Sequence, residues 1–378
     1  MHLSAPHQSS LTLCSREIHL VGELSASART AKIVIGICLR NQASKLPRAL
    51  GSALAQQVVQ DDCGVIVILD DSSTDSWETA VAPLLADPKV IILKANCGSA
   101  AKARNALLDW VDEHLPAAVW IARLDADDRF AGTEAVAALV EAGERAEARF
   151  VLGSNHLERG GVPQPHSNIA DPGWLHDTEH LVRFIEAFCL GHGEQELPSC
   201  NLLLRAHNGI RYPHTQSAED HWLVARLLLL ESERGVILPY PVVSVYSLGG
   251  ELTRANRRSD YWCRQRERLA QAARMWATFC ERSESLLGVG QEGVVWREGE
   301  WVHKQFYPWA MNADDARRVD ALVQGDEGPV PRAQWWQADG GEWHCRYAWF
   351  ESRPLPPRLP AETVKLSAAT ARLWLRHW

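Results

Sequence analysis

Apolar, β-branched runs alternate with helical repeats over residues 32–155, and this alternation limits the fold more than any other feature of the chain. The runs are "KIVIGICL" (32–39), "VIVIL" (65–69), "KVIIL" (89–93), "AVWIARL" (118–124) and "RFVLGSN" (149–155). The stretches between the runs have apolar residues at helical spacing, such as Leu46, Leu50 and Leu54 after the first run. Short connections between strands and helices predict an α/β fold, a mainly parallel sheet flanked by helices. Ligands of such sheets bind outside the carboxyl ends of the strands.

The composition is that of an ordinary globular protein. The chain has 378 residues, of which 46% are hydrophobic and 23% charged, so one large domain with a smaller one is the natural expectation. A net charge of −8 argues against nucleic acid as a partner. The nine cysteines show no metal-site or C-x-x-C spacing, and no apolar segment is long enough to span a membrane. We therefore expect a cytoplasmic protein without a transmembrane segment.

Acidic residues follow two of the predicted strands at the point where each strand ends. Asp70 and Asp71 end the second run, and Asp125, Asp127 and Asp128 end the fourth. A D-x-D pair alone is more often a solvated loop or a helix cap. Two clusters at one sheet edge, however, need cationic partners, and Mg²⁺ or Mn²⁺ held by carboxylate oxygens would bind a diphosphate. No glycine-rich phosphate loop follows the first run, which argues against dinucleotide-dependent oxidoreductases and P-loop enzymes.

Five stretches together resemble those of family 2 glycosyltransferases, which have the GT-A fold. They are "IVIGICLRN", "VIVILDDSSTD", "NCGSAAKARNALL", "LDADD" and "SAEDHW", in the order of that family and within residues 31–255. The resemblance implies an inverting transfer of a sugar from a nucleotide-diphosphate donor, with UDP as the expected nucleotide, to an acceptor hydroxyl. The acceptor would be a glycan, a lipid-linked intermediate or a small molecule.

The resemblance also implies which residues bind the donor. Asp70 and Asp71 would lie beside the nucleotide base, and Arg104 would lie nearby on the nucleotide. Asn41 would lie at the nucleotide site too, although the family usually has a Pro-Thr pair before it where this chain has Cys38 and Leu39.

The D-x-D pair would bind the donor phosphates through a metal. Asp125 would contact the ribose and the metal, and Asp127 would bind the metal, which we expect to be Mn²⁺ or Mg²⁺. Asp128 is either an additional acid of the site or a residue on the approach to the next helix.

The stretch "SAEDHW" has two interpretations. The spacing of Ser217 and Asp220 fits a capping box at the start of a helix. The resemblance instead implies that Asp220 is the catalytic base, with Glu219 as a supporting contact and either His221 or Trp222 beside the acceptor. One such carboxylate suffices for inverting transfer, because it only has to accept the proton of the attacking hydroxyl.

A second resemblance covers about residues 286–355. Gly288, Gly290 and Gly293 match G-x-G-x-x-G, and Lys304 follows on the next predicted strand, as in the amino-terminal lobe of protein kinases. No H-R-D or D-F-G stretch follows, so the segment alone lacks the parts needed for phosphoryl transfer. The alternative is a simple tryptophan-rich β-hairpin domain.

The sequence therefore predicts four parts: an extension at 1–30, a GT-A domain at 31–258, a linking helix at 259–285 and the kinase-lobe-like segment at 286–378. Two other functions remain open. One is a non-catalytic scaffold with a degenerate transferase fold, and the other is part of a kinase-like phosphotransferase.

Overall fold

The structure is a computed structural model that describes residues 18–159, 162–164, 172–192, 197, 199–215, 217–247, 260–280, 285–290, 292–317 and 333–348. The described residues fall into two compact units, the larger up to residue 280 and the smaller from 285 onward. Among the described helices, none combines the length and the hydropathy that a membrane crossing requires.

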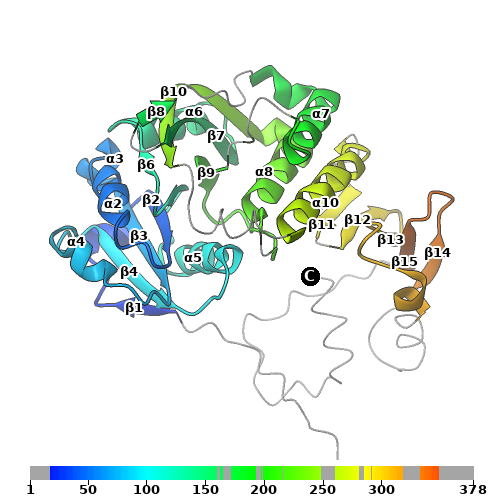
Figure 1. The fold of residues 1–378 in the computed structure, drawn as a ribbon, viewed down its shortest axis with the longest axis horizontal. Coiled ribbons are helices and arrows are strands. Elements are labelled where there is room, and N and C mark those ends of the chain that lie inside the picture. Colours follow the sequence, from blue (N-terminus) through cyan, green and yellow to red (C-terminus); the bar gives the residue numbers. More distant parts are fainter. Residues whose placement is uncertain are drawn as a thin grey trace, which may run out of the picture. The chain divides into compact units, whose positions relative to one another are not determined.

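A ten-stranded mixed sheet forms the centre of the larger unit (Figure 1). Its order is β1-β4-β3-β2-β5-β9-β7-β10-β6, with β8 paired to β7. The strands are β1 His19–Val21, β2 Ile33–Leu39, β3 Gly64–Asp71, β4 Val90–Ala95, β5 Trp120–Asp125, β6 Arg129–Phe130, β7 Phe150–Arg159, β8 Val162–Gln164, β9 Leu202–Arg205 and β10 Gly235–Ser247. The α/β fold predicted from the sequence, a largely parallel sheet flanked by helices, is confirmed.

Helices cover both faces of this sheet. The helices of the unit are α1 Ala26–Thr30, α2 Leu46–Leu54, α3 Gln57–Gln60, α4 Trp77–Leu85, α5 Ala100–His114, α6 Ala135–Arg145, α7 Thr178–Cys189, α8 Glu219–Leu230 and α10 Asp260–Ala277, with 3₁₀ turns at Pro172–His176 and Ser232–Arg234. The main core lies between one face of the sheet and α2, α3, α4 and α6. Helix α5 covers the opposite face, where Leu107 packs against Gly36 of β2.

Every strand in the middle of the sheet that the sequence predicts is present, but β9 runs against its neighbours. It pairs antiparallel with both β5 and β7, whereas β4, β3, β2 and β5 are all parallel. The amino end of β9 therefore lies at the edge where β5 and β7 end. The proline-interrupted stretch 235–247 is one strand, whose register against β7 shifts after Leu238.

Two stretches that flank the predicted GT-A domain lie in the larger unit. Residues 19–30 contain β1, which pairs with β4, and α1, so this part of the predicted extension is built into the larger unit. The predicted linking helix corresponds to α10, which packs against α7 and α8 of the same unit.

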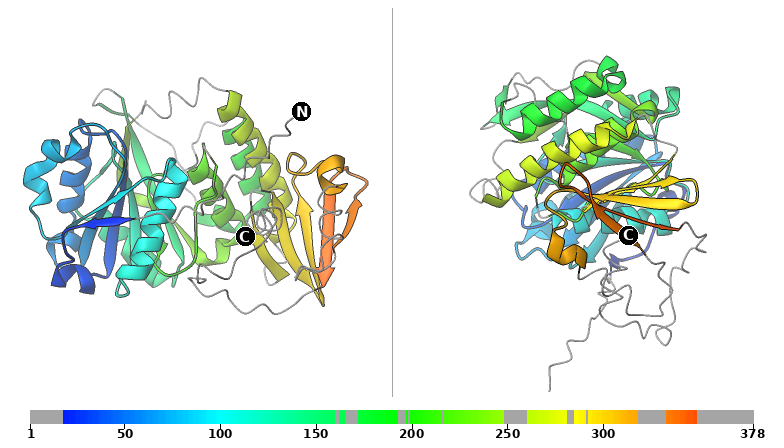
Figure 2. Two further views of the ribbon diagram at one scale, coloured as in Figure 1. Left: turned by 90° about the horizontal axis from the view of Figure 1, so that it is seen from below. Right: turned by 90° about the vertical axis from the view of Figure 1, so that its right-hand side faces the viewer.

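The described residues of the smaller unit include a five-stranded antiparallel sheet, shown in yellow to orange in Figure 2. Its order is β11-β12-β13-β15-β14, and the strands are β11 Leu286–Val289, β12 Gly293–Glu298, β13 Trp301–Phe306, β14 Gln334–Gln337 and β15 Trp343–Ala348. Lys304 lies on β13 opposite Cys345, and its Nζ is 2.9 Å from Glu292 Oε2. Residues 349–355, the end of the kinase-like resemblance, lie outside the described residues, and the resemblance stays a prediction.

Gly293, the third glycine of the G-x-G-x-x-G match, is required for the packing of β12 against β13. A Cβ on Gly293 would overlap the carbonyl oxygen of Gln305 on the paired strand, whereas a Cβ on Gly288 or Gly290 would meet nothing within 4 Å. We expect Gly293→Ala to lower the free energy of unfolding of this unit by about 1–3 kcal/mol. Urea unfolding followed by tryptophan fluorescence measures it, with Gly290→Ala as the matched control. Equal losses in both variants would contradict this explanation.

Candidate functional site

The predicted acids lie at the carboxyl edge of the larger unit's sheet. Asp70 and Asp71 are the last residues of β3, and Asp125 is the last residue of β5. Strand β2 lies between them, with Leu39 opposite Asp70 and Cys38 opposite Asp125. The fold therefore brings both acidic clusters to the same edge of the sheet, on the two strands that flank β2.

Asp70 is enclosed by its own loop. The residue is 2% exposed, and its carboxylate accepts hydrogen bonds from Trp77 Nε1 at 3.1 Å, Lys94 Nζ at 3.0 Å and Ser73 N at 2.9 Å. Burial alone would raise the pKa of Asp70, but these hydrogen bonds outweigh burial and lower it. Both carboxylate oxygens are thus used inside the protein, which favours a structural role in shaping the loop after β3.

Asp70→Asn should lower the free energy of unfolding by about 1.5–3 kcal/mol at neutral pH, because hydrogen bonds to a buried charge are lost. The pKa of Asp70 is lower in the folded than in the unfolded state, so its contribution is present above the unfolded pKa and disappears as the pH falls through the folded pKa. Urea titrations at pH 7 and at pH 3 should therefore show a smaller difference from wild type at the lower pH. A difference that stays constant with pH would contradict this role.

Asp71 positions the amino end of α5. Its Oδ1 accepts hydrogen bonds from Cys97 N and, at 3.1 Å, from Gly98 N, and Ser99 caps the helix through Lys102 N. Gly98 has a φ of +74°, which favours glycine there.

Asn41 joins two neighbouring strand ends. Its N donates to Ser73 Oγ at 2.9 Å, and its Oδ1 accepts from Thr74 N at 2.7 Å. Asn41, Asp70 and Asp71 thus belong to one set of loops at the ends of β2 and β3.

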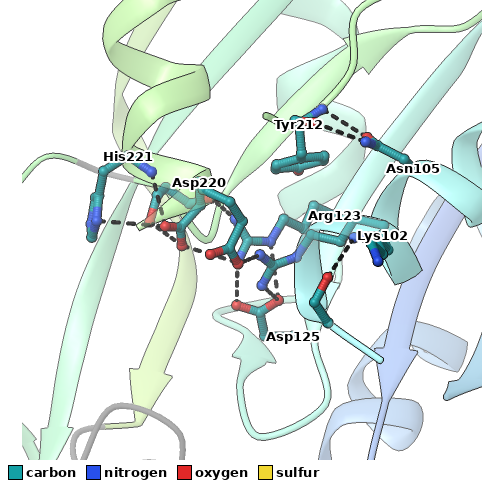
Figure 3. A network of polar contacts seen from close by, with 11 residues as sticks. Lys102, Asn105, Arg123, Asp125, Tyr212, Asp220 and His221 are labelled. Atoms are coloured by element: carbon teal, nitrogen blue, oxygen red, sulfur yellow. Dashed lines mark hydrogen bonds and ion pairs between the residues drawn. The ribbon is translucent and has the colours of Figure 1, made fainter. Parts of the chain in front are cut away.

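Two arginines, the buried Arg123 and the partly buried Arg104, neutralise the carboxylate of Asp125; Figure 3 shows Arg123 beside it. Arg123, from β5, donates through Nε to Oδ1 at 3.0 Å and through Nη2 to Oδ2 at 2.5 Å. Arg104, from α5, donates to Oδ1 at 3.2 Å and also forms an ion pair with Glu219. Burial would raise the pKa of Asp125, but the two guanidinium groups outweigh burial and lower it. These arginines explain how clustered acids can lie together here.

The amino end of α8 meets the same arginines. Arg123 Nη2 lies 3.4 Å from Asp220 Oδ2, and Ser199 Oγ donates to that oxygen at 3.1 Å. His221 N donates to Asp220 Oδ1 at 2.9 Å, and His221 Nδ1 lies 3.5 Å from it. Hence "LDADD" and "SAEDHW", 95 residues apart in Asp125 and Asp220, form one polar network. The capping box is absent, because Ala218 is the N-cap residue and makes no side-chain cap hydrogen bond.

The two acids at the start of α8 differ in pKa. Burial would raise the pKa of Asp220, but His221, Arg123 and Arg104 hold it well below its ordinary value. For Glu219, burial and the nearby Asp220 outweigh Arg104, so its pKa is raised. Burial lowers the pKa of His221 to about 4, so its ring is neutral at pH 7. Asp220 is therefore ionised at neutral pH.

The other two acids of "LDADD" have different surroundings. Asp127 is partly exposed and lies 3.4 Å from Lys45 Nζ, and burial and Asp125 raise its pKa. Asp128 is 1% exposed, and its Oδ1 accepts from Ser247 N at 2.8 Å while Oδ2 has no hydrogen-bond partner. Asp128 thus fixes the end of β10, whereas Asp127 has an accessible carboxylate that lacks full charge compensation.

Tyr212 lies beneath the two arginines. The guanidinium carbons of Arg104 and Arg123 are 5.4 and 6.0 Å from the centre of its ring. A cavity of about 30 Å³ adjoins these three side chains and Asp125. That volume accommodates about two water molecules, so any larger ligand would bind outside it, over the sheet edge.

Of the residues that the sequence predicts, Arg104 pairs with Asp125 and Glu219, and Asp220 is connected to them through Arg123. Asp127 lies beside this network, and Asn41, Asp70 and Asp71 line the adjacent loops. Sequence reasoning missed Arg123, Ser199 and Tyr212. For Arg123 a signal exists, since a single charged residue inside "AVWIARL" stands two positions before Asp125 and so on the same face of the strand. No described group of three or more His, Cys, Asp or Glu residues has the geometry to hold a metal ion alone.

The chain was compared with known protein families and structures. Residues 34–206 match the family model "Glycosyl transferase family 2". No curated protein sequence matches significantly. Solved structures with a similar fold include S. aureus TarS 1–349 in complex with UDP-GlcNAc, with 17% identity, 67% of this chain and 72% of that chain covered, and a TM-score of 0.46. Another is the mannosyltransferase PcManGT from Pyrobaculum calidifontis in complex with GDP-Man and Mn²⁺, with 14% identity, 68% and 75% covered, and a TM-score of 0.41.

The matched residues run from β2 to just beyond β9. They include Arg104, Arg123, Asp125 and Asp127, and they end before Asp220. The match agrees with the resemblance carried by the sequence motifs and with the mixed α/β sheet. Residues 34–206, a little under half of the chain, therefore match glycosyltransferase family 2.

Proposed function

We propose that this chain transfers a sugar, with inversion, from a nucleotide-diphosphate donor to an acceptor hydroxyl, with Asp220 as the general base. The observation that carries the proposal is the ion-pair network that joins Asp125 to Asp220 through Arg123. In an inverting transfer, the base acts on one face of the anomeric carbon and the donor diphosphate leaves from the other. The base and the carboxylates that hold the donor therefore have to lie close together. UDP-sugars are the donors to test first.

Asp220 has the properties that a base in this reaction needs. It is ionised at neutral pH, and Ser199 and His221 fix its orientation by hydrogen bonds. As the acceptor oxygen attacks the anomeric carbon, its proton passes to an Asp220 carboxylate oxygen, and the bond between that carbon and the diphosphate oxygen breaks. Glu219 supports the site through its ion pair with Arg104.

A divalent cation, Mn²⁺ or Mg²⁺, fits the residues at this edge. Asp127 has a raised pKa because of burial and its neighbour Asp125, and a cation would relieve that repulsion. Both oxygens of Asp125 accept hydrogen bonds from arginines, so Asp127 would be the main protein ligand. Mg²⁺ typically binds one or two carboxylates together with substrate phosphates, which agrees with a site of few protein ligands. When bound, the cation would neutralise the charge of the leaving diphosphate.

The proposed function can be tested by ligand screening of the full chain. Thermal unfolding is measured with UDP- and GDP-sugars, each with Mn²⁺ or with EDTA, followed by an assay for release of the nucleoside diphosphate. A donor at 100 times its Kd should stabilise the protein by about 2.7 kcal/mol. If no nucleotide sugar shifts the transition or is turned over, the transferase proposal fails. A shift with ATP alone would favour the kinase-like alternative.

A further inference from the structure

Arg123 contacts three different parts of the site. It is 9% exposed and lies near the end of β5, two residues before Asp125. Its Nε and Nη2 donate to Asp125, its Nη1 donates to Ser199 O at 2.5 Å, and Nη2 also approaches Asp220. One guanidinium group therefore connects the end of β5, the segment before β9 and the start of α8.

We propose that Arg123 is a positioning residue that holds the base Asp220 at a fixed place relative to the donor-side carboxylate Asp125. This role rests on the proposed function and adds to it a residue with no assigned part in the reaction. It requires a planar group with several donors in a fixed arrangement, which arginine has and lysine lacks.

Ser199 completes the connection around Asp220. Its carbonyl oxygen accepts from Arg123 Nη1, and its hydroxyl donates to Asp220 Oδ2. Arg123, Ser199 and Asp220 thus form a closed triangle of contacts. Since a carboxylate held from two sides loses rotational freedom, its oxygen is kept oriented before the acceptor arrives.

The ring of Tyr212 packs against both arginines of the site, Arg104 and Arg123. Two neighbouring guanidinium groups repel one another, and the face of an aromatic ring attracts both. Two hydrogen bonds to the side chain of Asn105 fix the backbone of Tyr212 (Figure 3). Asn105 Nδ2 donates to Tyr212 O at 2.8 Å, and Asn105 Oδ1 accepts from Tyr212 N at 2.7 Å. The arginine pair therefore rests on a fixed support, which a positioning role needs.

The main test is Arg123→Lys, which keeps the positive charge that the buried carboxylates need but removes the fork of donors. We expect kcat to fall about 10- to 100-fold, because small misplacements of reacting groups cost this much. The effect should depend on the base. In an Asp220→Asn background, Arg123→Lys should cause no further loss of kcat, and Ser199→Ala should behave in the same way.

A matched control is Arg149→Lys. Arg149, at the amino end of β7, also pairs with a carboxylate, Glu231, and donates to a backbone carbonyl, that of Asn208. We expect wild-type kcat and KM from this variant.

Two results would overturn the inference. One is a kcat of Arg123→Lys equal to that of wild type, and the other is losses that multiply in the double variant with Asp220→Asn. If Arg123→Lys does not fold, as circular dichroism would show, the Ser199→Ala pair decides the question, since that substitution removes only one hydroxyl. These outcomes differ from failure of the proposed function, in which the wild-type chain itself would not turn over any nucleotide sugar.

Discussion

Asp220→Asn should lower kcat by about 10²- to 10⁴-fold while the donor Kd stays within about threefold of the wild-type value. The amide keeps the size of the side chain, and its single oxygen can still accept from His221 N while its NH2 group can donate to Ser199 Oγ, but it cannot accept a proton at neutral pH. The loss should therefore fall on the chemical step and not on donor binding. Steady-state kinetics together with calorimetric donor binding separates the two.

A suitable control for this variant is Asp112→Asn. Asp112 is a carboxylate of α5 that pairs with Arg211 and His207, outside the network around Asp125. Near-normal kcat in Asp220→Asn would contradict its role as the base. A loss of donor binding as large as the loss of kcat would indicate that the substitution disturbs Arg123 and Asp125 instead.

Asp127→Asn should weaken donor binding in the presence of Mn²⁺ by about 100-fold or more, because the cation contributes several kcal/mol to holding the diphosphate. With EDTA, wild type and variant should bind the donor with equal, low affinity. Since the substitution also removes a carboxylate that Asp125 destabilises, the variant should unfold no earlier than wild type without metal. Calorimetric titrations with Mn²⁺ and with EDTA measure the difference.

The control for Asp127→Asn is Asp62→Asn, which removes another carboxylate paired with a lysine, Lys89, at a distance of 2.7 Å. This variant should keep the metal dependence of wild type. Donor affinity in wild type that is the same with Mn²⁺ and with EDTA would refute the proposed metal site.

The sequence predicts most strands and helices of the larger unit, because both the apolar runs of the buried strands and the helical spacing of the leucines are clear in it. Runs such as "VIVIL" and the leucines of α2 occupy the elements expected of them, and the acids at the ends of β3 and β5 follow from that assignment. The direction of β9 could not be predicted, because an apolar run has the same pattern in either direction. Short elements such as β1 also escaped detection, since three residues show no periodicity.

The site itself was predicted in part, for a physical reason. The acids indicate that positive charge is needed, but not what supplies it, and a metal ion is the simplest answer from sequence alone. In the structure, Arg104 and Arg123 supply much of that charge to Asp125. Gly293 is a second example of a residue with two possible explanations. Its place in a glycine motif suggests a phosphate loop, whereas in the structure a glycine is needed there because β13 approaches its backbone closely.

The reversed strand β9 lies between two parts of the site that are far apart along the chain. The strands and loops that present Asp70, Asp71 and Asp125 are complete by residue 125, whereas the chain reaches Ser199 only after residues 150–198. A change within that later stretch would alter the surroundings of Asp220 and leave the loops that carry Asp70, Asp71 and Asp125 as they are. Under the proposed function, such a change would act on acceptor choice while donor binding is kept.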